Sequence, residues 1–426
     1  MKAEVVAFDG DTMAVHVPVT KEAKQEAYEK LLPSQNLFKP GHGDFMYMPS
    51  MEQIMGLYLM TKPDSTSEPE KSFSTKDEAL KAYKEARRND EKWSLEDLIE
   101  VGGKRMTMGQ LKVNEILPDE YEEWDEPIDE DYLEDMFQEM NEDEDVTKQQ
   151  ITTIADKLKD LGNKHCYKRG FTVGLSDLEV DYGKRDKIYG EALEKVKDED
   201  DPKKLFEEFS KAEEQVVEEI KKENEDNSFI QMAASGAKGG DDNLRSILAG
   251  PGLLTDNKGD VVETPVTTSY AEGIDSSDYW TSMYGARKGM IDRAKSTAEP
   301  GAFTKELINN TLDQVITTED CKTLNGKTKS IDNRNIKGRV LAENTSVANK
   351  GDILDSHTIK ELKKSGVEEV KVRSPLKCEA DKGLCAKCYG TMPDGSLPDV
   401  GENIGVIAGH AMTEPSTQMT ICNKVA

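Results

Sequence analysis

The sequence predicts an α+β chain of several domains, in which long helices outweigh short strands and a metal holds one region together. Hydrophobic residues make up 36% of the 426 residues and charged residues 33%, which favours thin helical hairpins and solvated surface over one large globule. Apolar residues recur at helical spacing in several segments, and four cysteines are spaced like metal ligands. A chain of this length holds roughly two to four domains.

The chain is strongly acidic. Its 84 acidic and 56 basic residues give a formal charge of −28, which argues against electrostatic capture of nucleic acid by the chain as a whole. Any contact with nucleic acid must therefore be local. No Lys or Arg occurs between Lys112 and Lys148, and we expect this acidic segment to be a solvated or partly disordered surface.

The sequence indicates a cytosolic protein. No segment approaches the ~20 apolar residues that a membrane helix needs, and the first residues do not resemble a signal peptide. In the cytosol, six cysteines indicate thiols or metal ligands rather than disulfides.

Residues 1–60 predict a strand, a turn and a second strand, followed by helices. Apolar residues alternate between positions 5 and 19 around Asp9-Gly10-Asp11, and helical spacing follows at 21–32 and 53–60. Two carboxylates on one turn could hold a divalent cation that binds substrate phosphates. Asp-Gly is also the commonest hairpin turn, and spacing alone favours that simpler interpretation.

The middle of the chain is expected to be helical. Residues 61–175 form a polar, acidic region with a short helix at 75–87, and residues 176–234 contain two helices broken at Pro202. The second helix repeats apolar residues at near-heptad spacing, namely Leu205, Phe209, Ala212, Val216 and Ile220. An antiparallel coiled-coil hairpin over residues 186–224 is the simplest structure.

Residues 235–310 are expected to combine a glycine-rich loop with a long helix. Glycines crowd between positions 235 and 259, and a helix follows over 275–309, bendable at Gly285, Gly289 and Pro300-Gly301. The basic residues of this helix are Arg287, Lys288, Arg293, Lys295 and Lys305. They could track a phosphate backbone, although a solvated helix face explains them equally well.

Four cysteines carry the most specific chemical signal. The candidate ligands are Cys321, Cys378, Cys385 and Cys388. Six residues separate the second from the third and two separate the third from the fourth, and Gly390 permits the tight turn that aims two thiolates at one ion. Four sulfurs form a closed Zn²⁺ shell, which is structural and could contribute on the order of 10 kcal/mol to the folding of residues 311–400.

The surroundings of the cysteines predict little regular structure. Short strands alternate with turns over residues 321–391, and a final helix at 401–412 is expected to end near Pro415. Cys166 and Cys422 are expected to be ordinary thiols.

Several segments match, in the same order, the motifs of one protein family. They are FDGDTMAVHVP at 8–18, VETPV at 262–266, YGARKG at 284–289, TEDC at 318–321, VRSP at 372–375, GENIGVIA at 401–408 and EPSTQ at 414–418. In these segments the sequence resembles the β′ (largest) subunit of bacterial-type multisubunit DNA-directed RNA polymerase and its plastid and giant-phage relatives. The resemblance runs almost from end to end.

The resemblance implies a multi-domain fragment of that subunit. Its parts would be the active-site loop and the end of a double-psi β-barrel in 1–60, an acidic funnel in 61–175, a coiled-coil rim hairpin in 176–234, a supporting loop and bridge helix in 235–310, a zinc-binding domain in 311–400 and the start of the trigger loop in 401–426.

The resemblance also implies an activity: nucleotidyl transfer from NTPs to an RNA 3′ end on a DNA template. It would require a β-type chain and the remaining β′ pieces. Asp9 and Asp11 would hold the catalytic Mg²⁺, and the four cysteines Zn²⁺. Thr297 and Ala298 would lie under the templating base pair. The residues near the nucleic-acid backbone would be Arg287, Lys288 and Lys305.

The sequence departs from the family pattern at both ends. Val5 and Ala7 replace an Asn and the first metal-binding Asp, so two carboxylates remain instead of three, and the match stops after Thr420. The chain could be a naturally split subunit, as in giant phages, or the reading frame of an interrupted gene with read-through at 1–7 and 422–426. The alternatives for function are a non-catalytic zinc-binding scaffold or regulatory relic, and a stand-alone zinc protein that would be a stable monomer.

Overall fold

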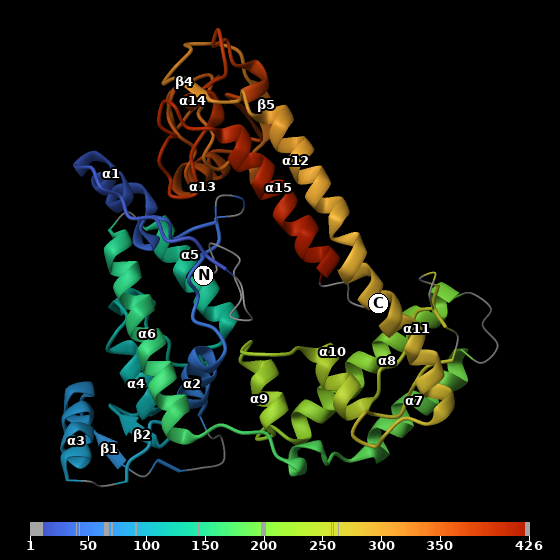
Figure 1. Cartoon of the computed structure of the whole chain (residues 1–426). Helices are drawn as coiled ribbons and strands as arrows, with labels where there is room; N and C mark the ends of the chain where they lie inside the picture. Colours follow the sequence, from blue (N-terminus) through green and yellow to red (C-terminus); the bar gives the residue numbers. More distant parts are fainter. Residues whose placement is uncertain are drawn as a thin grey trace. The chain divides into compact units, whose positions relative to one another are not determined.

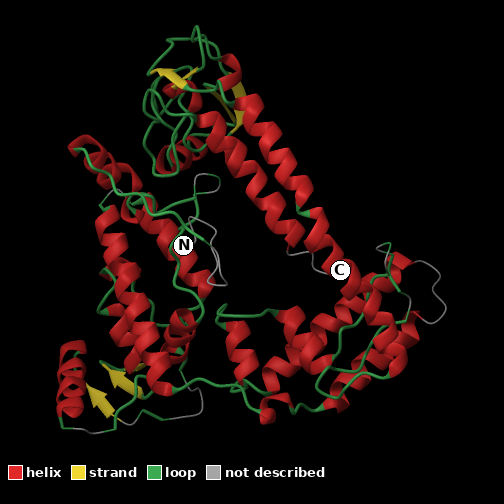
Figure 2. Ribbon diagram, viewed as in Figure 1, coloured by secondary structure: helices red, strands yellow, loops and turns green. Residues whose placement is uncertain are grey.

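The computed structural model describes residues 12–39, 41, 43–63, 68–69, 71–89, 92–143, 145–196, 202–256, 258, 260–262 and 264–421. Helices predominate and the strands are short (Figure 2). The chain divides into two compact units. Unit 1 combines Met1–Met46, Gln138–Lys148 and Ile291–Asn423, whereas unit 2 is built mainly from Tyr47–Phe137 and Gln149–Met290. None of the described helices is both long enough and apolar enough to cross a membrane.

Among the described residues of the N-terminal part of unit 1, the second of the two expected strands is not formed, and the first strand with its turn lies outside them. Residues 12–19 pair with no strand, and Val15, Val17 and Val19 are exposed. A β-strand persists only when its backbone groups find partners, which this segment does not have among the described residues. The elements that follow are α1 (Lys21–Glu26), the π-helical turn η2 (Ala27–Leu31) and the 3₁₀ turn η3 (Pro33–Gln35). Within the described part of residues 1–60, the strand pairing is one isolated β-bridge between Phe38 and Phe45, and the double-psi barrel expected here stays a prediction.

A small sheet and two helices form one core of unit 2. The strands are β1 (Lys71–Phe73), β2 (Leu98–Val101) and β3 (Lys104–Thr107), and the helices are α3 (Lys76–Arg88) and α4 (Met108–Asn114). β2 pairs in parallel with β1 and antiparallel with β3. Thr75 caps α3 by accepting a hydrogen bond from the Glu78 N–H, which explains why the predicted helix begins there. Tyr83, Trp93 and Ile99 are buried together between the layers.

Three further helices stand beside this core, and one of them corrects an expectation. They are α2 (Glu52–Thr61), α5 (Glu130–Glu142) and α6 (Lys148–Arg169). The prediction of a solvated or disordered acidic segment is wrong for α5, because Leu133, Met136 and Phe137 recur at helical spacing and are buried. Gly56 and Gly162 let α2 and α6 approach closely, since a Cβ on Gly56 would lie 2.0 Å from the Gly162 carbonyl oxygen.

The predicted helical hairpin is present in unit 2 as α7 (Tyr182–Val196) and α8 (Pro202–Glu223), packed against each other. Of the heptad residues, the four whose side chains are described are buried: Phe209, Ala212, Val216 and Ile220. Tyr189 of α7 stacks on Phe209, with ring centroids 5.3 Å apart. The glycine-rich stretch that follows is less irregular than expected, because it contains α10 (Asp241–Leu244) and the π-helical turn η6 (Arg245–Ala249), which pack with α9 (Ser228–Ala234) on the hairpin core.

The predicted long helix is divided at a different point from the one expected. It consists of α11 (Ser276–Ile291), the π-helical turn η7 (Asp292–Ser296) and α12 (Ala298–Thr311). Gly285 and Gly289 lie inside α11 without interrupting it. Pro300 falls in the first turn of α12, where backbone N–H groups have no partner within that helix, so the irregular turn comes before the proline.

In unit 1, α12 and α15 (Ile404–Ile421) lie side by side (Figure 1). They run antiparallel, because the start of α15 meets the end of α12: the Gly405 N–H donates to the Gln314 carbonyl, and the Thr311 hydroxyl donates to the Gly405 carbonyl at 3.0 Å. The expectation that this helix ends near Pro415 is wrong. Packing along α12 offsets the ~3 kcal/mol that an interior proline costs.

The region around the cysteines in unit 1 forms two two-stranded sheets. β4 (Ile316–Thr318) pairs in parallel with β7 (Leu384–Cys385), and β5 (Lys327–Ser330) pairs antiparallel with β6 (Glu369–Val372). The helices here are α13 (Ser356–Lys364) and α14 (Ala386–Tyr389). α13 was not predicted; Asp355 caps it by accepting from the Thr358 N–H, and Leu362 anchors it in a core with Leu341 and Val370.

The remaining short elements are 3₁₀ turns. They are η4 (Asp119–Tyr121), η5 (Leu175–Leu178), η8 (Arg334–Ile336) and η9 (Pro375–Lys377).

Candidate metal centre

The structure brings the four predicted cysteines together. One sulfur from each of Cys321, Cys378, Cys385 and Cys388 lies within 4.8 Å of all the others. The Cys321 Sγ is 3.7 Å from the Cys388 Sγ and 3.8 Å from the Cys378 Sγ. Four sulfurs at the usual Zn–S distance of about 2.3 Å in a tetrahedron are about 3.8 Å apart. The cluster therefore has the spacing of a structural zinc shell.

Strand pairing explains how residues far apart in the sequence meet. Cys321 follows β4, and β4 pairs with β7, which ends at Cys385. The Cys385 N–H points to the Cys378 Sγ at 3.4 Å, and the Cys388 N–H to the Cys385 Sγ at 3.3 Å. Gly390 has a φ of +100°, as the predicted tight turn requires, and a Cβ there would lie 2.7 Å from the Gly338 carbonyl oxygen. These backbone contacts bring Cys378, Cys385 and Cys388 together.

A buried cation faces the sulfurs. Arg373, only 3% exposed, directs Nη2 to the Sγ atoms of Cys321 at 3.1 Å, Cys388 at 3.2 Å and Cys385 at 3.5 Å. Its Nη1 donates to an Asp320 carboxylate oxygen at 2.6 Å. The other oxygen of that carboxylate lies 3.3 Å from the Lys387 Nζ.

The surroundings shift the pKa values of the thiols in different directions: burial raises the pKa of Cys378 and of Cys388, whereas the pKa of Cys321 is lowered. Burial would raise the pKa of the Cys321 thiol, but hydrogen bonds from the backbone at Glu379 and Thr323 and from neighbouring thiols outweigh it and lower the pKa to about 6. Burial would likewise raise the pKa of Asp320, yet the hydrogen bond from Arg373 helps to lower it to about 2. A thiolate is the form that binds a metal.

The other predicted site residues are not gathered in this way. Asp9 and Asp11 lie outside the described residues. Arg287 and Lys288 are in α11, Thr297 joins η7 to α12, and Ala298 and Lys305 are in α12. Arg287, Ala298 and Lys305 are exposed, and Lys288 is half-buried. The three cations form no ion pair with any residue in the described ranges.

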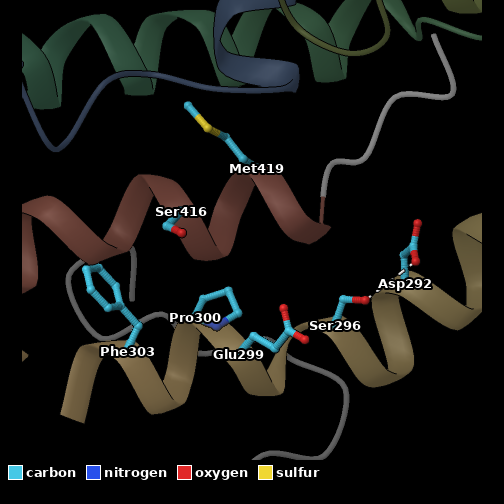
Figure 3. Close-up of a pocket in the computed structure, with 7 residues that line it drawn as sticks. All are labelled: Asp292, Ser296, Glu299, Pro300, Phe303, Ser416 and Met419. Atoms are coloured by element: carbon cyan, nitrogen blue, oxygen red, sulfur yellow. Dashed lines mark hydrogen bonds between the residues drawn. The ribbon is translucent and has the colours of Figure 1, made fainter. Parts of the chain in front are cut away.

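An open pocket of about 540 Å³ lies between η7–α12 and the end of α15 (Figure 3). Asp292, Ser296 and Glu299 line its polar end, Pro300 and Phe303 extend it along α12, and Ser416 and Met419 border it from α15. The lining residues include two carboxylates and no basic side chain. Because like charges repel, these carboxylates disfavour the binding of a phosphate in this pocket when the chain is without partners.

Arg373 lies at the cysteine cluster although the sequence did not single it out. It belongs to the VRSP segment before the cysteines, but its contact with the sulfurs becomes visible only where β5 pairs with β6. The sequence does contain a clue to this residue. A buried group of thiolates needs a cation nearby, and Arg373 is five positions before Cys378.

Sequence comparison finds two matching family profiles. RNA polymerase Rpb1, domain 4, matches residues 178–277, and RNA polymerase Rpb1, domain 5, matches residues 273–423. The first match contains the α7–α8 hairpin, and the second contains η7, α12, all four cysteines and α15.

Curated relatives extend the similarity over nearly the whole chain. The DNA-directed RNA polymerase subunit beta′ of Sulfurihydrogenibium sp. (strain YO3AOP1) is 32% identical over 97% of this chain and 29% of that protein. The subunit of the same name from Aquifex aeolicus (strain VF5) is 32% identical over the same shares. That of Kocuria rhizophila is 32% identical over 97% of this chain and 36% of its own length. The chain thus spans about a third of the length of these relatives.

Proposed function

This chain belongs to the family of bacterial-type RNA polymerase β′ subunits, as a segment of one, and we therefore propose that it takes part in DNA-directed RNA synthesis. In this proposal it contributes to nucleotidyl transfer from NTPs to the RNA 3′ end, and only in an assembly with a β-type chain and the remaining β′ pieces. The observation that carries the proposal is the collinear similarity over 97% of the chain. Two family profiles that match consecutive segments of the chain in one order give further support.

The catalytic role is assigned to the N-terminal turn. Asp9 and Asp11 would hold a Mg²⁺ ion, which when bound supplies charge stabilisation for phosphoryl transfer. Support comes from the FDGDTMAVHVP segment, in which the two carboxylates are separated by one residue in the sequence. The sequence supplies two carboxylates rather than three at this turn, because Ala7 occupies the third position.

The nucleic-acid role is assigned to α11, η7 and α12, which would form the bridge helix. Arg287, Lys288 and Lys305 would lie near the nucleic-acid backbone. These three side chains contact solvent and form no ion pair with a described residue, which supports the role. A cation that is free in this way can bind a phosphate and release the counterions of DNA or RNA. Thr297 and Ala298, at the junction of η7 and α12, would lie under the templating base pair.

The zinc role is structural. Cys321, Cys378, Cys385 and Cys388 would hold Zn²⁺ and tie β4 to β7 and α14. A closed metal shell would add folding energy beside the apolar core that contains Leu341, Leu362 and Val370. Because α12 leads directly into β4, the ion would fix the end of the helix that carries Lys305.

The proposal also assigns each segment of the chain to a part of the subunit and gives its ligands and cellular setting. The six segments of the chain would correspond to the active-site loop, funnel, rim hairpin, bridge helix, zinc-binding domain and the first part of the trigger loop, with the boundaries given above. DNA template, RNA and NTPs would be its ligands in the assembly. A split subunit in the cytosol of a bacterium, or of a phage-infected cell, is the setting we propose.

Reconstitution with the partner chains tests the catalytic assignment. We expect Asp9→Ala and Asp11→Ala each to lower template-directed RNA synthesis by at least about 100-fold, because each removes a ligand of the ion that stabilises the transition state. Asp226→Ala, which alters an exposed turn aspartate, is the matched control and should leave the rate unchanged. Full activity of Asp9→Ala would refute the assignment.

A second candidate, a non-catalytic scaffold or relic of the subunit, is favoured by one observation: Ala7 at the position of a metal-binding Asp. The two functions differ in the effect of Ala7→Asp. An active enzyme with a weakened site should need less Mg²⁺ after this substitution. A relic should stay inactive with either residue, while still assembling with its partner chains.

A further inference from the structure

We propose that Arg373 is a positioning residue of the zinc shell: its guanidinium neutralises the metal-bound thiolates and sets how tightly the ion is held. This inference rests on the proposed zinc role of the four cysteines and adds a residue to it. The observation behind it is one buried guanidinium directed at three of the four sulfurs.

The geometry distinguishes Arg373 from an incidental neighbour. Nη2 lies 3.1, 3.2 and 3.5 Å from the sulfurs of Cys321, Cys388 and Cys385. It therefore covers the face of the sulfur tetrahedron opposite Cys378. Cys378 receives a backbone N–H instead, from Cys385 at 3.4 Å. Every sulfur of the described cluster thus has a donor or a cation beside it.

Charge explains why a cation is needed there. Four thiolates around one Zn²⁺ carry a net charge of about −2. Cys385 and Cys388 are fully buried, and a buried charge is costly unless it is paired and hydrogen-bonded. Among the described residues, Arg373 is the cationic side chain within hydrogen-bond distance of the sulfurs. It lowers the free energy of the charged shell relative to the metal-free thiols.

The fork of the guanidinium holds the side chain in place. While Nη2 faces the sulfurs, Nη1 donates to Asp320 at 2.6 Å, and Asp320 is itself held by Lys387 at 3.3 Å. Arginine can address two partners from two nitrogens in a fixed plane, whereas the single ammonium of lysine cannot. Asp320 therefore orients Arg373, and Arg373 orients the shell from the end of β6.

The test compares zinc retention in the full-length chain for the native protein, Arg373→Met, Arg373→Lys and Asp320→Asn. The control is Arg339→Met, because Arg339 also packs on this region but donates to the Tyr389 carbonyl at 2.5 Å and to no sulfur. Zinc transfer to a competing chromophoric chelator gives the release rate. The absorption of the Co²⁺-substituted chain gives the sulfur-to-metal charge-transfer energy, which a purely structural residue would not alter.

We expect one Zn²⁺ per chain in every variant, with release from Arg373→Met about 10-fold faster than from the native chain. Its charge-transfer band should move to lower energy, because unneutralised thiolates donate electrons more readily. Arg373→Lys and Asp320→Asn should show smaller shifts in the same direction, and Arg339→Met none. If Arg373→Met does not fold, the band position of the lysine variant decides.

Two results would contradict us, and they differ in meaning. Native release rates and a native Co²⁺ spectrum in both Arg373 variants would overturn the role of Arg373 while leaving the zinc shell intact. A native chain that purifies without zinc and binds neither Zn²⁺ nor Co²⁺ would overturn the zinc shell itself.

Discussion

At the scale of single residues, four thiols from three segments of the chain gather around the guanidinium of Arg373. The CxxC spacing and Gly390 indicated Cys385 and Cys388 as candidate ligands, because the local turn is encoded within a few residues. Arg373 could not be assigned in the same way, since its contact with the sulfurs depends on the pairing of β5 with β6 across about 40 residues of sequence.

A second network at the residue scale gives a prediction for pH. The Glu96 carboxylate accepts hydrogen bonds from His165 at 3.0 Å and Arg169 at 2.8 Å. Burial would raise the pKa of Glu96, but these two partners outweigh it and hold the pKa below the usual 4.5. A lowered folded-state pKa contributes stability at pH values above the unfolded pKa, and this contribution is lost as the pH falls through the folded pKa.

We therefore expect Glu96→Gln to lower the free energy of unfolding by about 1 kcal/mol at pH 7, because part of the network is exposed to solvent. The difference from the native chain should shrink as the pH falls below 4.5. Urea denaturation at several pH values measures it, with the exposed Glu85→Gln as control. A difference that is constant with pH would show that the carboxylate charge is not responsible.

At the scale of elements, helices with clear caps and apolar periodicity were predictable. α3 begins behind Thr75 as expected, and α8 begins at Pro202. Acidic composition concealed the apolar face of α5, and α13 was missed because its nine residues carry few apolar side chains. The continuation of α15 through Pro415 could not be predicted, because its packing on α12 joins segments about 100 residues apart.

The closeness of α12 and α15 provides a test at this scale. A Cβ on Gly405 would lie 2.0 Å from the Thr311 carbonyl oxygen, whereas one on Gly301 would meet nothing within 4 Å. We expect Gly405→Ala to lower the free energy of unfolding by about 1–3 kcal/mol through overpacking. Gly301→Ala, also in a helix of this pair, should be neutral or stabilising by up to about 1 kcal/mol. Thermal denaturation of both variants measures the contrast; equal effects would mean that the helices do not approach as described.

At the scale of the whole molecule, the family was accessible from sequence because its motifs occur in a fixed order. The division into two units was not, since unit 1 joins three stretches of chain that are separate in the sequence. The change of unit between Met290 and Ile291 falls within the long helix predicted as one element. The expectation from composition stays a prediction: with a charge of −28, contact with nucleic acid should be confined to a few basic positions.

In the proposed function, Thr297 and Ala298 would lie under the templating base pair during RNA synthesis. The most direct measurement places a photoreactive base in the template strand opposite the RNA 3′ end of a complex reconstituted with the partner chains. Mass spectrometry of the crosslinked peptides then identifies the contact. We predict a crosslink in the peptide that contains Thr297 and Ala298. A complex that extends RNA while its template crosslinks only to other chains would contradict the claim.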